Sequence, residues 1–236
     1  VSDQQNVVLP QINKGEMFEM RQVDVYWSFR SPYSYLATSR LRQMSQSWDV
    51  PFVFRPVYPI AVRIPGFFKT VNPLWPPYLV RDCLRIAEYQ GLPFGRPDPD
   101  PIVMDMQSGE VEAEQPYIHR LTRLGVVASH TPQAMAFFDE VSRLIWGGQK
   151  SWMADRNLEI AVADAGLNLS ALERDVAART DEIEAEIEAN EAAQKAAGHW
   201  GVPLMVFEDE PFFGQDRLDL LEWRLGKAGV AKSGNA

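Results

Sequence analysis

The sequence contains a single cysteine, Cys83, among its 236 residues. One cysteine cannot form a disulfide bond within the chain, and nothing in the cysteine content points to an oxidising compartment. A cytoplasmic setting therefore fits the composition best. The three histidines, His119, His130 and His199, are far apart in the sequence and have no cysteine at ligand spacing. We therefore expect no metal site.

An excess of basic residues is also lacking. The 23 Lys and Arg against 32 Asp and Glu give a formal net charge of −9, which argues against binding to nucleic acid or to an anionic membrane surface. No apolar run approaches the roughly 20 residues that a membrane-spanning helix needs. Residues 1–20 lack the basic start and continuous apolar core of a signal peptide, and we interpret them as an N-terminal arm.

The most informative segment is 23–37, where an apolar, β-rich run stops and Ser31-Pro32-Tyr33-Ser34 opens a helix. Thiol–disulfide exchange proteins place a Cys-x-x-Cys pair at such a corner, because the positive end of the helix lowers the pKa of the first thiol. Here both of those positions are serines. A thiolate that acts at this corner must therefore arrive with a ligand.

The predicted elements follow the order strand, helix, strand, helical segment, strand, strand, helix. The spacing of apolar residues predicts strands over 23–29, 52–57, 204–207 and 211–213, and helices over 33–47, 78–91, 115–127, 132–147, 155–166, 170–197 and 216–225. Prolines at positions 65, 73, 76 and 77 are expected to break the chain after the second strand. We therefore expect an α/β domain over 21–62 and 198–228, an all-helical insertion domain over 63–197, and a tail at 229–236.

Three motifs in this order resemble one family. Ser-Pro-Tyr-Ser-Tyr-Leu-Ala at 31–37, Gly-Val-Pro at 201–203 and Phe-Phe-Gly-Gln-Asp-Arg-Leu at 212–218 are similar to those of 2-hydroxychromene-2-carboxylate isomerases and kappa-class glutathione transferases. The likeness extends from about Val23 to Leu225. It implies a thioredoxin-like fold with an all-helical insertion, a glutathione cofactor, a small aromatic or electrophilic substrate, and a homodimer.

The resemblance implies that Ser31 donates its hydroxyl to the sulfur of glutathione. A hydroxyl donor and the positive end of a helix both favour the thiolate, which is the competent nucleophile. Serine is also among the best residues for capping a helix, so a cap is the alternative role, and the two are compatible. Ser34 is expected to be structural.

The other glutathione contacts that the resemblance implies lie near the C-terminus. Pro203 resembles the cis-proline that faces the corner in thioredoxin-like proteins, where the backbone of the preceding residue, Val202, pairs with an extended peptide such as glutathione. Gln215 and Asp216 begin the last helix, where free N–H groups attract a carboxylate and an Asp accepts from an ammonium. The alternatives are a strand-opening proline and an Asp that only complements the helix dipole.

Two further residues are predicted to contact substrate or glutathione. Asn72 matches an asparagine of the family in the same region. Trp75 stands where the family often has a lysine near a carboxylate of glutathione or substrate, and Arg63, Lys69 and Arg81 are the candidate replacements for that lysine. The apolar, proline-rich stretch around Trp75 suits a flat aromatic substrate, and it equally suits core packing.

The leading hypothesis is a glutathione-dependent isomerase of the 2-hydroxychromene-2-carboxylate isomerase type. A kappa-like glutathione transferase is the enzymatic alternative. The third hypothesis is a thioredoxin-like binding protein without catalytic activity. Release of a rearranged substrate separates the first two, and absence of glutathione affinity would favour the third.

Overall fold

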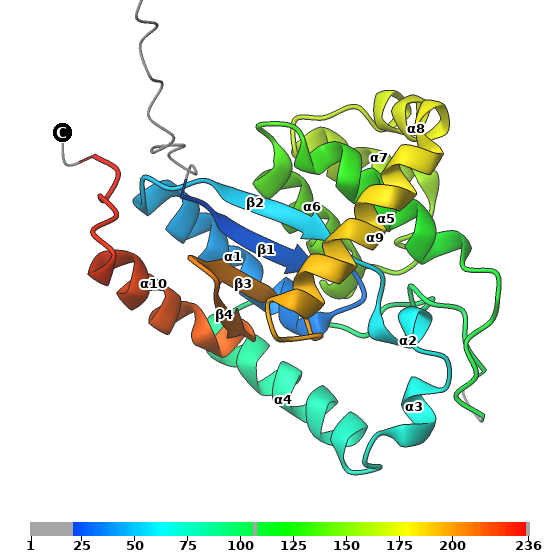
Figure 1. The fold of residues 1–236 in the computed structure, drawn as a ribbon. Coiled ribbons are helices and arrows are strands. Elements are labelled where there is room, and N and C mark those ends of the chain that lie inside the picture. Colours follow the sequence, from blue (N-terminus) through cyan, green and yellow to red (C-terminus); the bar gives the residue numbers. More distant parts are fainter. Residues whose placement is uncertain (1–20, 106–107, 235–236) are drawn as a thin grey trace, which may run out of the picture.

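The protein is described by a computed structural model over residues 21–105 and 108–234 (Figure 1). The predicted arm at 1–20 lies outside the described residues. The described strands form one mixed sheet with the order β2-β1-β3-β4, comprising β1 (Val23–Trp27), β2 (Phe52–Pro56), β3 (Leu204–Phe207) and β4 (Glu210–Phe213). β1 is parallel to β2 and antiparallel to β3, and β3 is antiparallel to β4. The predicted α/β architecture is confirmed.

The central strand β1 lies between β2 and β3, with Val25 opposite both Phe54 and Met205. Val23, Val25 and Trp27 are fully buried. A strand that is covered on its faces tolerates such an apolar sequence, and its β-branched residues suit the pleated backbone. The chain leaves β1 at its carboxyl end and turns into the next helix, which creates the serine corner.

Helix α1 (Pro32–Ser47) starts with proline, which lacks the N–H that the first turn leaves unpaired anyway. The last helix, α10 (Leu218–Lys227), contacts α1 and β4. After α10 the chain returns to the end of α1, where the Asp49 N–H donates to the Ala231 carbonyl at 2.9 Å. The described part of the predicted tail is therefore held against the body of the protein.

The segment between β2 and β3 is helical, as predicted. It contains α2 (Ile60–Arg63), α3 (Phe67–Thr70), α4 (Trp75–Gln90), α5 (Pro116–Ser129), α6 (Ala134–Trp146), α7 (Asp155–Asp164), α8 (Leu169–Ala178) and α9 (Thr180–Ala196). α5 and α9 contact β2, α6 contacts α1, and α7 and α8 pack outside them. Within the described part of the chain, no helix is both long and apolar enough to cross a membrane.

Several predicted elements needed correction. The predicted helix over 170–197 is two helices that meet at Arg179. Pro76 and Pro77 do not break the chain but lie in the first turn of α4, where a missing N–H costs nothing. The short helices α2 and α3 were not predicted. The last helix is preceded by a 3-10 turn, η1 (Gln215–Arg217).

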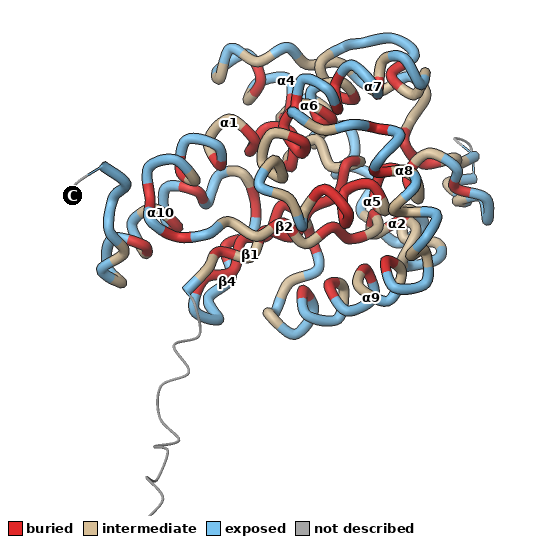
Figure 2. The backbone as a smooth tube through the Cα atoms, turned by 90° about the horizontal axis from the view of Figure 1, so that it is seen from above, coloured by how far each residue is buried: buried red, intermediate tan, exposed pale blue. Residues whose placement is uncertain are grey.

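The insertion and the sheet share one cluster of buried side chains. Figure 2 colours the backbone by burial, and buried residues occur both in the strands and in the helices of the insertion. Phe138 of α6 stacks on Phe54 of β2 with ring centroids 4.2 Å apart and also meets Trp27 of β1 edge-on at 5.8 Å. Aromatic contacts of this kind stabilise a core beyond the area that they bury. The helical insertion therefore forms one side of the core that supports the corner, and the division into two domains stays a prediction.

Candidate active site

Ser31 caps α1, as its residue type predicts. Its backbone is extended, with φ −86° and ψ 115°, and its Oγ accepts from the Ser34 N–H at 3.1 Å. The same Oγ lies 3.1 Å from the Val202 carbonyl oxygen. Because a carbonyl oxygen can only accept, the Ser31 hydroxyl must donate its proton to Val202. Ser31 therefore joins the corner to the segment that precedes β3.

The Val202–Pro203 peptide bond is cis, which confirms the conformation that the resemblance implies. The Pro203 carbonyl accepts from the Gly214 N–H at 2.9 Å, so this segment also connects to the end of β4. Within the described residues, the Val202 N–H has no hydrogen-bond partner. A free backbone donor next to Ser31 is available to an extended peptide.

Gln215 and Asp216 follow at once, in η1, which contacts α1. Gly214 permits this turn because its φ is +102° and because a Cβ there would lie 2.6 Å from the Asp216 carboxylate. Asp216 pairs with Arg217 at 2.6 Å, and the two side chains are 58% and 49% exposed. An ion pair this exposed contributes little stability, so the Asp216 carboxylate can exchange its partner at small cost.

Asn72 and Trp75 lie apart from these groups. The Asn72 Oδ1 accepts from the Leu74 N–H at 3.0 Å, and Trp75 begins α4 next to α3 (Figure 1). Within the described residues neither side chain hydrogen-bonds with Ser31 or Val202. The structure thus brings together Ser31, Val202, Pro203, Gln215 and Asp216 but not Asn72 and Trp75, and a site role stays a prediction for all seven residues.

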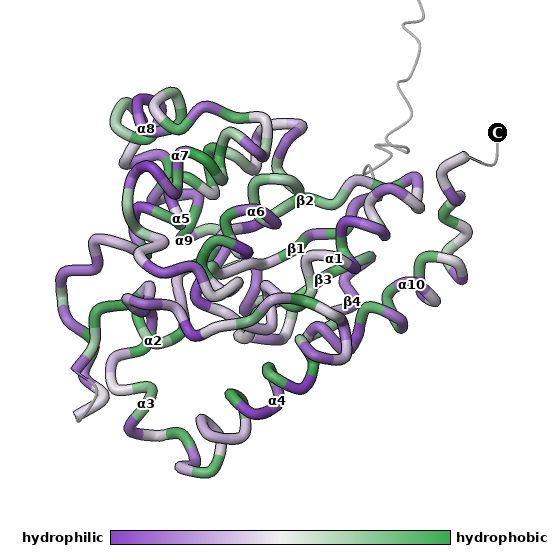
Figure 3. The backbone as a smooth tube through the Cα atoms, turned by 180° about the vertical axis from the view of Figure 1, so that it is seen from behind, coloured by the Kyte–Doolittle hydropathy of each residue, from purple (hydrophilic) through white to green (hydrophobic). Residues whose placement is uncertain are grey.

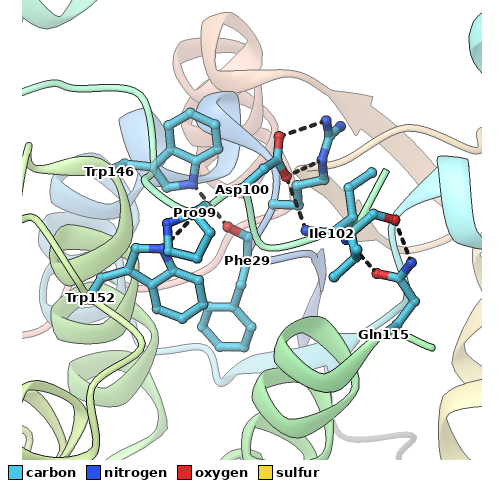
Figure 4. Close-up of polar contacts among 9 residues, drawn as sticks. Phe29, Pro99, Asp100, Ile102, Gln115, Trp146 and Trp152 are labelled. Atoms are coloured by element: carbon cyan, nitrogen blue, oxygen red, sulfur yellow. Dashed lines mark hydrogen bonds and ion pairs between the residues drawn. The ribbon is translucent and has the colours of Figure 1, made fainter. Parts of the chain in front are cut away.

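Two contacts that the sequence did not predict hold the residues before Ser31 (Figure 4). The Phe29 carbonyl accepts from Trp146 Nε1 at 2.9 Å, and Arg30 makes a two-point ion pair with Asp100 at 2.9 and 3.1 Å. Asp100 lies in an irregular segment whose sequence has no periodicity, so no signal in the sequence indicated this pair. These contacts anchor the corner to the insertion.

A buried network holds the segment before Pro203. Gln194 of α9 is fully buried, and its Nε2 donates to the Gly201 carbonyl at 2.8 Å. Arg63 donates to the Gln194 Oε1 and to the Trp200 carbonyl, each at 3.0 Å. Burial lowers the pKa of Arg63, and the nearby Glu191 carboxylate opposes that shift. Of the three proposed replacements for the family lysine, Arg63 is therefore engaged with this segment, while Lys69 pairs with Glu110.

The comparisons with known proteins agree with the fold. The model of the DSBA-like thioredoxin domain matches residues 22–226. The chain belongs to this DSBA-like family. The 2-hydroxychromene-2-carboxylate isomerase of Pseudomonas putida is 25% identical over 212 residues, which cover 87% of this chain and 94% of that protein. The enzyme of the same name from Sphingobium xenophagum is 26% identical over 206 residues, covering 86% and 96%.

A solved structure of a 2-hydroxychromene-2-carboxylate isomerase matches with a TM-score of 0.63 and 26% identity, covering 88% of this chain and 95% of that chain. The predicted thioredoxin-like fold and the predicted resemblance are thereby confirmed. Relatives that carry the name of an isomerase support an enzymatic role for this member of the DSBA-like family.

This DSBA-like chain has no reactive thiol at its corner. Cys83 is fully buried on α4, and burial together with the neighbouring Asp82 raises its pKa to about 12. Ser34 is also fully buried, and its hydroxyl has no partner within the described residues, in keeping with a structural role. No group of three or more potential metal ligands occurs in the described ranges. The corner presents the Ser31 hydroxyl and the first backbone amides of α1, and η1 adds the Asp216 carboxylate.

Proposed function

We propose that this protein is a glutathione-dependent isomerase of the 2-hydroxychromene-2-carboxylate isomerase type. The observation that carries the proposal is the contact between Ser31 and Val202 at a corner without cysteine. It joins a capping hydroxyl, a helix N-terminus and a free backbone N–H. The names and the coverage of the relatives support the same reaction class.

The residues present fit glutathione as a cofactor. The free Val202 N–H and the backbone on either side of Pro203 would pair with its extended peptide. The Asp216 carboxylate and the backbone of Gln215 would hold its γ-glutamyl end. Asp216 would then exchange its exposed ion pair with Arg217 for a contact with the ammonium of glutathione. The corner would then face the sulfur.

Ser31 has a defined part in this proposal. Its hydroxyl now donates to the Val202 carbonyl, and rotation about the Cβ–Oγ bond would direct the same proton to a thiolate. The Oγ would keep its bond from the Ser34 N–H during that change, so the helix cap is preserved. Donation to a charged group and the dipole of α1 together favour the thiolate over the thiol.

When bound, glutathione would supply a thiolate whose addition turns a double bond of the conjugated ring into a single bond and opens the ring, and whose elimination after rotation about that single bond restores the double bond. Such covalent catalysis divides one difficult step into easier ones. The predicted contacts of Asn72 and Trp75 with a small aromatic or electrophilic substrate stay predictions from the sequence, because both residues lie at or just before the start of α4, apart from Ser31 and Val202.

A kappa-like transferase would use the same corner and differs only in the product. An isomerase returns glutathione unchanged, whereas a transferase consumes it, so mass analysis of the product decides between them. Lack of any glutathione affinity would indicate a binding protein without catalytic activity.

The first test is calorimetric titration of the protein with glutathione, using Asp216→Asn as the diagnostic variant. Loss of a charge-assisted hydrogen bond is expected to weaken binding by about ten- to a hundredfold and to leave folding unchanged. Asp219→Asn is the matched control, because Asp219 is 80% exposed in the next turn and pairs with Arg40. A loss of about 0.3 to 1 kcal/mol of stability with unchanged affinity would instead limit Asp216 to complementing the helix dipole.

A further inference from the structure

A row of aromatic rings lies beside the corner. Trp200 precedes Val202 by two residues, and its ring meets Phe67 of α3 at 5.8 Å. Phe67 meets Phe68 at 5.5 Å, and Phe68 lies 5.2 Å from the guanidinium of Arg30, the residue before Ser31. Ser31 hydrogen-bonds to Val202, so the ring contacts and the short pieces of chain between them form a continuous loop of residues around the corner.

The row continues on the other side of Trp200. His199 stacks on Trp200 at 5.5 Å and on Phe213 at 3.8 Å. Phe213 is followed directly by Gly214, Gln215 and Asp216. The aromatic row, defined as Phe213, His199, Trp200, Phe67 and Phe68, therefore runs from the proposed glutathione contacts to the residue before Ser31.

The segment that carries the middle of the row is built to hold it. A Cβ at Gly201 would lie 2.4 Å from the Phe213 ring and 3.0 Å from the His199 ring, so only glycine allows this stacking. The Gly201 N–H donates to His199 Nδ1 at 2.9 Å, which leaves the imidazole proton on Nε2. Burial lowers the pKa of His199, in the direction that favours the neutral ring, and the hydrogen bond with the Gly201 backbone opposes that shift.

Rings of the row are partly exposed to solvent, and hydrogen bonds hold the backbone that carries Trp200. Trp200 is 50% exposed and Phe213 is 39% exposed, in contrast to the core ring of Trp27, which is fully buried. The backbone under Trp200 is nevertheless held by Arg63 and Gln194. Exposed rings that are fixed before binding lose little conformational freedom when a flat molecule stacks on them.

We propose that the aromatic row, with Trp200 at its centre, is the stacking surface for a flat conjugated ring in the substrate, in place of Trp75. This inference rests on the proposed function, because it places the substrate next to Ser31. The charge of Arg30 at the end of the row is balanced by Asp100, so recognition there depends on planarity more than on charge. A flat acid and a puckered acid of equal charge should therefore bind differently.

The test uses the glutathione-loaded full chain and two carboxylates of matched size, 2-naphthoate and decahydro-2-naphthoate. By calorimetry, 2-naphthoate is expected to bind more tightly, and Trp200→Ala is expected to weaken it about three- to tenfold, as loss of an aromatic contact implies. Trp75→Ala and Trp223→Ala are the controls, since these tryptophans are 40% and 57% exposed and do not belong to the aromatic row. Both control variants should bind 2-naphthoate as tightly as the unmodified protein does.

Equal binding of the two acids, or a loss in Trp75→Ala without a loss in Trp200→Ala, would overturn the inference. Should Trp200→Ala melt at a lower temperature than the controls, Phe67→Leu provides the same comparison from α3. Glutathione is titrated into every variant separately. Normal glutathione binding without naphthoate binding rejects only the aromatic row, whereas absent glutathione binding rejects the proposed function itself.

Discussion

At the scale of single residues, the hydroxyl of Ser31 has two partners. It accepts from the Ser34 N–H, which stabilises α1, and it donates to the Val202 carbonyl, which joins the corner to the cis-proline segment. A role in capping is therefore observed, and a role toward a thiolate requires only that the donated proton change its acceptor. The two roles predict different measurable quantities.

We expect Ser31→Ala to lower both stability and thiolate content. Loss of the cap should cost about 0.5 to 2 kcal/mol of unfolding free energy. Loss of a donor to a charged sulfur, worth roughly 1.5 to 3 kcal/mol, should raise the pKa of bound glutathione by about one to two units. Ultraviolet absorbance of the thiolate, followed against pH, measures the second effect. Ser31→Thr keeps a hydroxyl and is the control; a titration that is the same in all three proteins would reduce Ser31 to a cap.

The same corner predicts the absence of disulfide oxidoreductase activity. Ser31 and Ser34 occupy both positions of the exchange pair, and the thiol of Cys83 is buried with a raised pKa. Reduction of insulin by dithiothreitol should therefore proceed at the background rate when the protein is added. The double variant with Ser31→Cys and Ser34→Cys tests the assay on the same scaffold. Clear catalysis by the unmodified chain would refute this interpretation of the corner.

At the scale of elements, the segment 198–203 derives its position from α9 and α2. Gln194 and Arg63 bind the carbonyls of Gly201 and Trp200, so the backbone that would receive glutathione is held from behind. Gln194 is fully buried, and a buried carbonyl that loses its donor cannot turn to water. This network is therefore expected to affect the affinity for glutathione as well as the free energy of unfolding.

We expect Gln194→Leu to destabilise the protein by about 1 to 3 kcal/mol and to weaken glutathione binding, because it leaves the Gly201 carbonyl without its donor. Asn190→Leu is the matched control. Asn190 lies on the same helix, is 5% exposed and donates to the Pro56 carbonyl, away from segment 198–203. Urea unfolding of both variants measures their stability, and calorimetry measures their affinity for glutathione. Equal losses of glutathione affinity would show that the effect is one of general stability.

Much of this arrangement was predictable from sequence because its signals are local. The corner is marked by a β-rich run, a capping serine and a proline within a few residues, and the amphipathic helices follow from apolar spacing. The division between α8 and α9 was missed because Arg179 interrupts the helix without glycine or proline. The pairs Arg30–Asp100 and Arg63–Trp200 were missed for another reason. They join residues 70 and 137 positions apart, and only the tertiary fold brings them together.

At the scale of the whole molecule, the start of α4 exposes three large apolar side chains close together in the sequence. Leu74, Trp75 and Tyr78 are 78%, 40% and 55% exposed, and the C-terminal half of the helix buries Cys83 and Ala87 on one side while exposing Leu84 and Tyr89. Figure 3 shows hydrophobic and hydrophilic stretches alternating along α4, and Figure 1 shows the helix at the edge of the molecule. Exposed apolar surface of this kind is typical of contact sites between proteins.

We therefore predict that the protein forms a homodimer, as the family resemblance also implies, and that the start of α4 lies in the interface. A second copy would bury apolar surface there, and removing such surface from water is favourable by roughly 25 cal/mol per Å². Sedimentation at micromolar concentration should show a dimer, and Leu74→Glu combined with Tyr78→Glu should yield a monomer, because charge at the centre of an apolar interface opposes its desolvation. Tyr89→Glu is the control, since Tyr89 is 90% exposed at the other end of the same helix. A dimer that survives the double change would place the interface on another surface, and a strict monomer would contradict the prediction altogether.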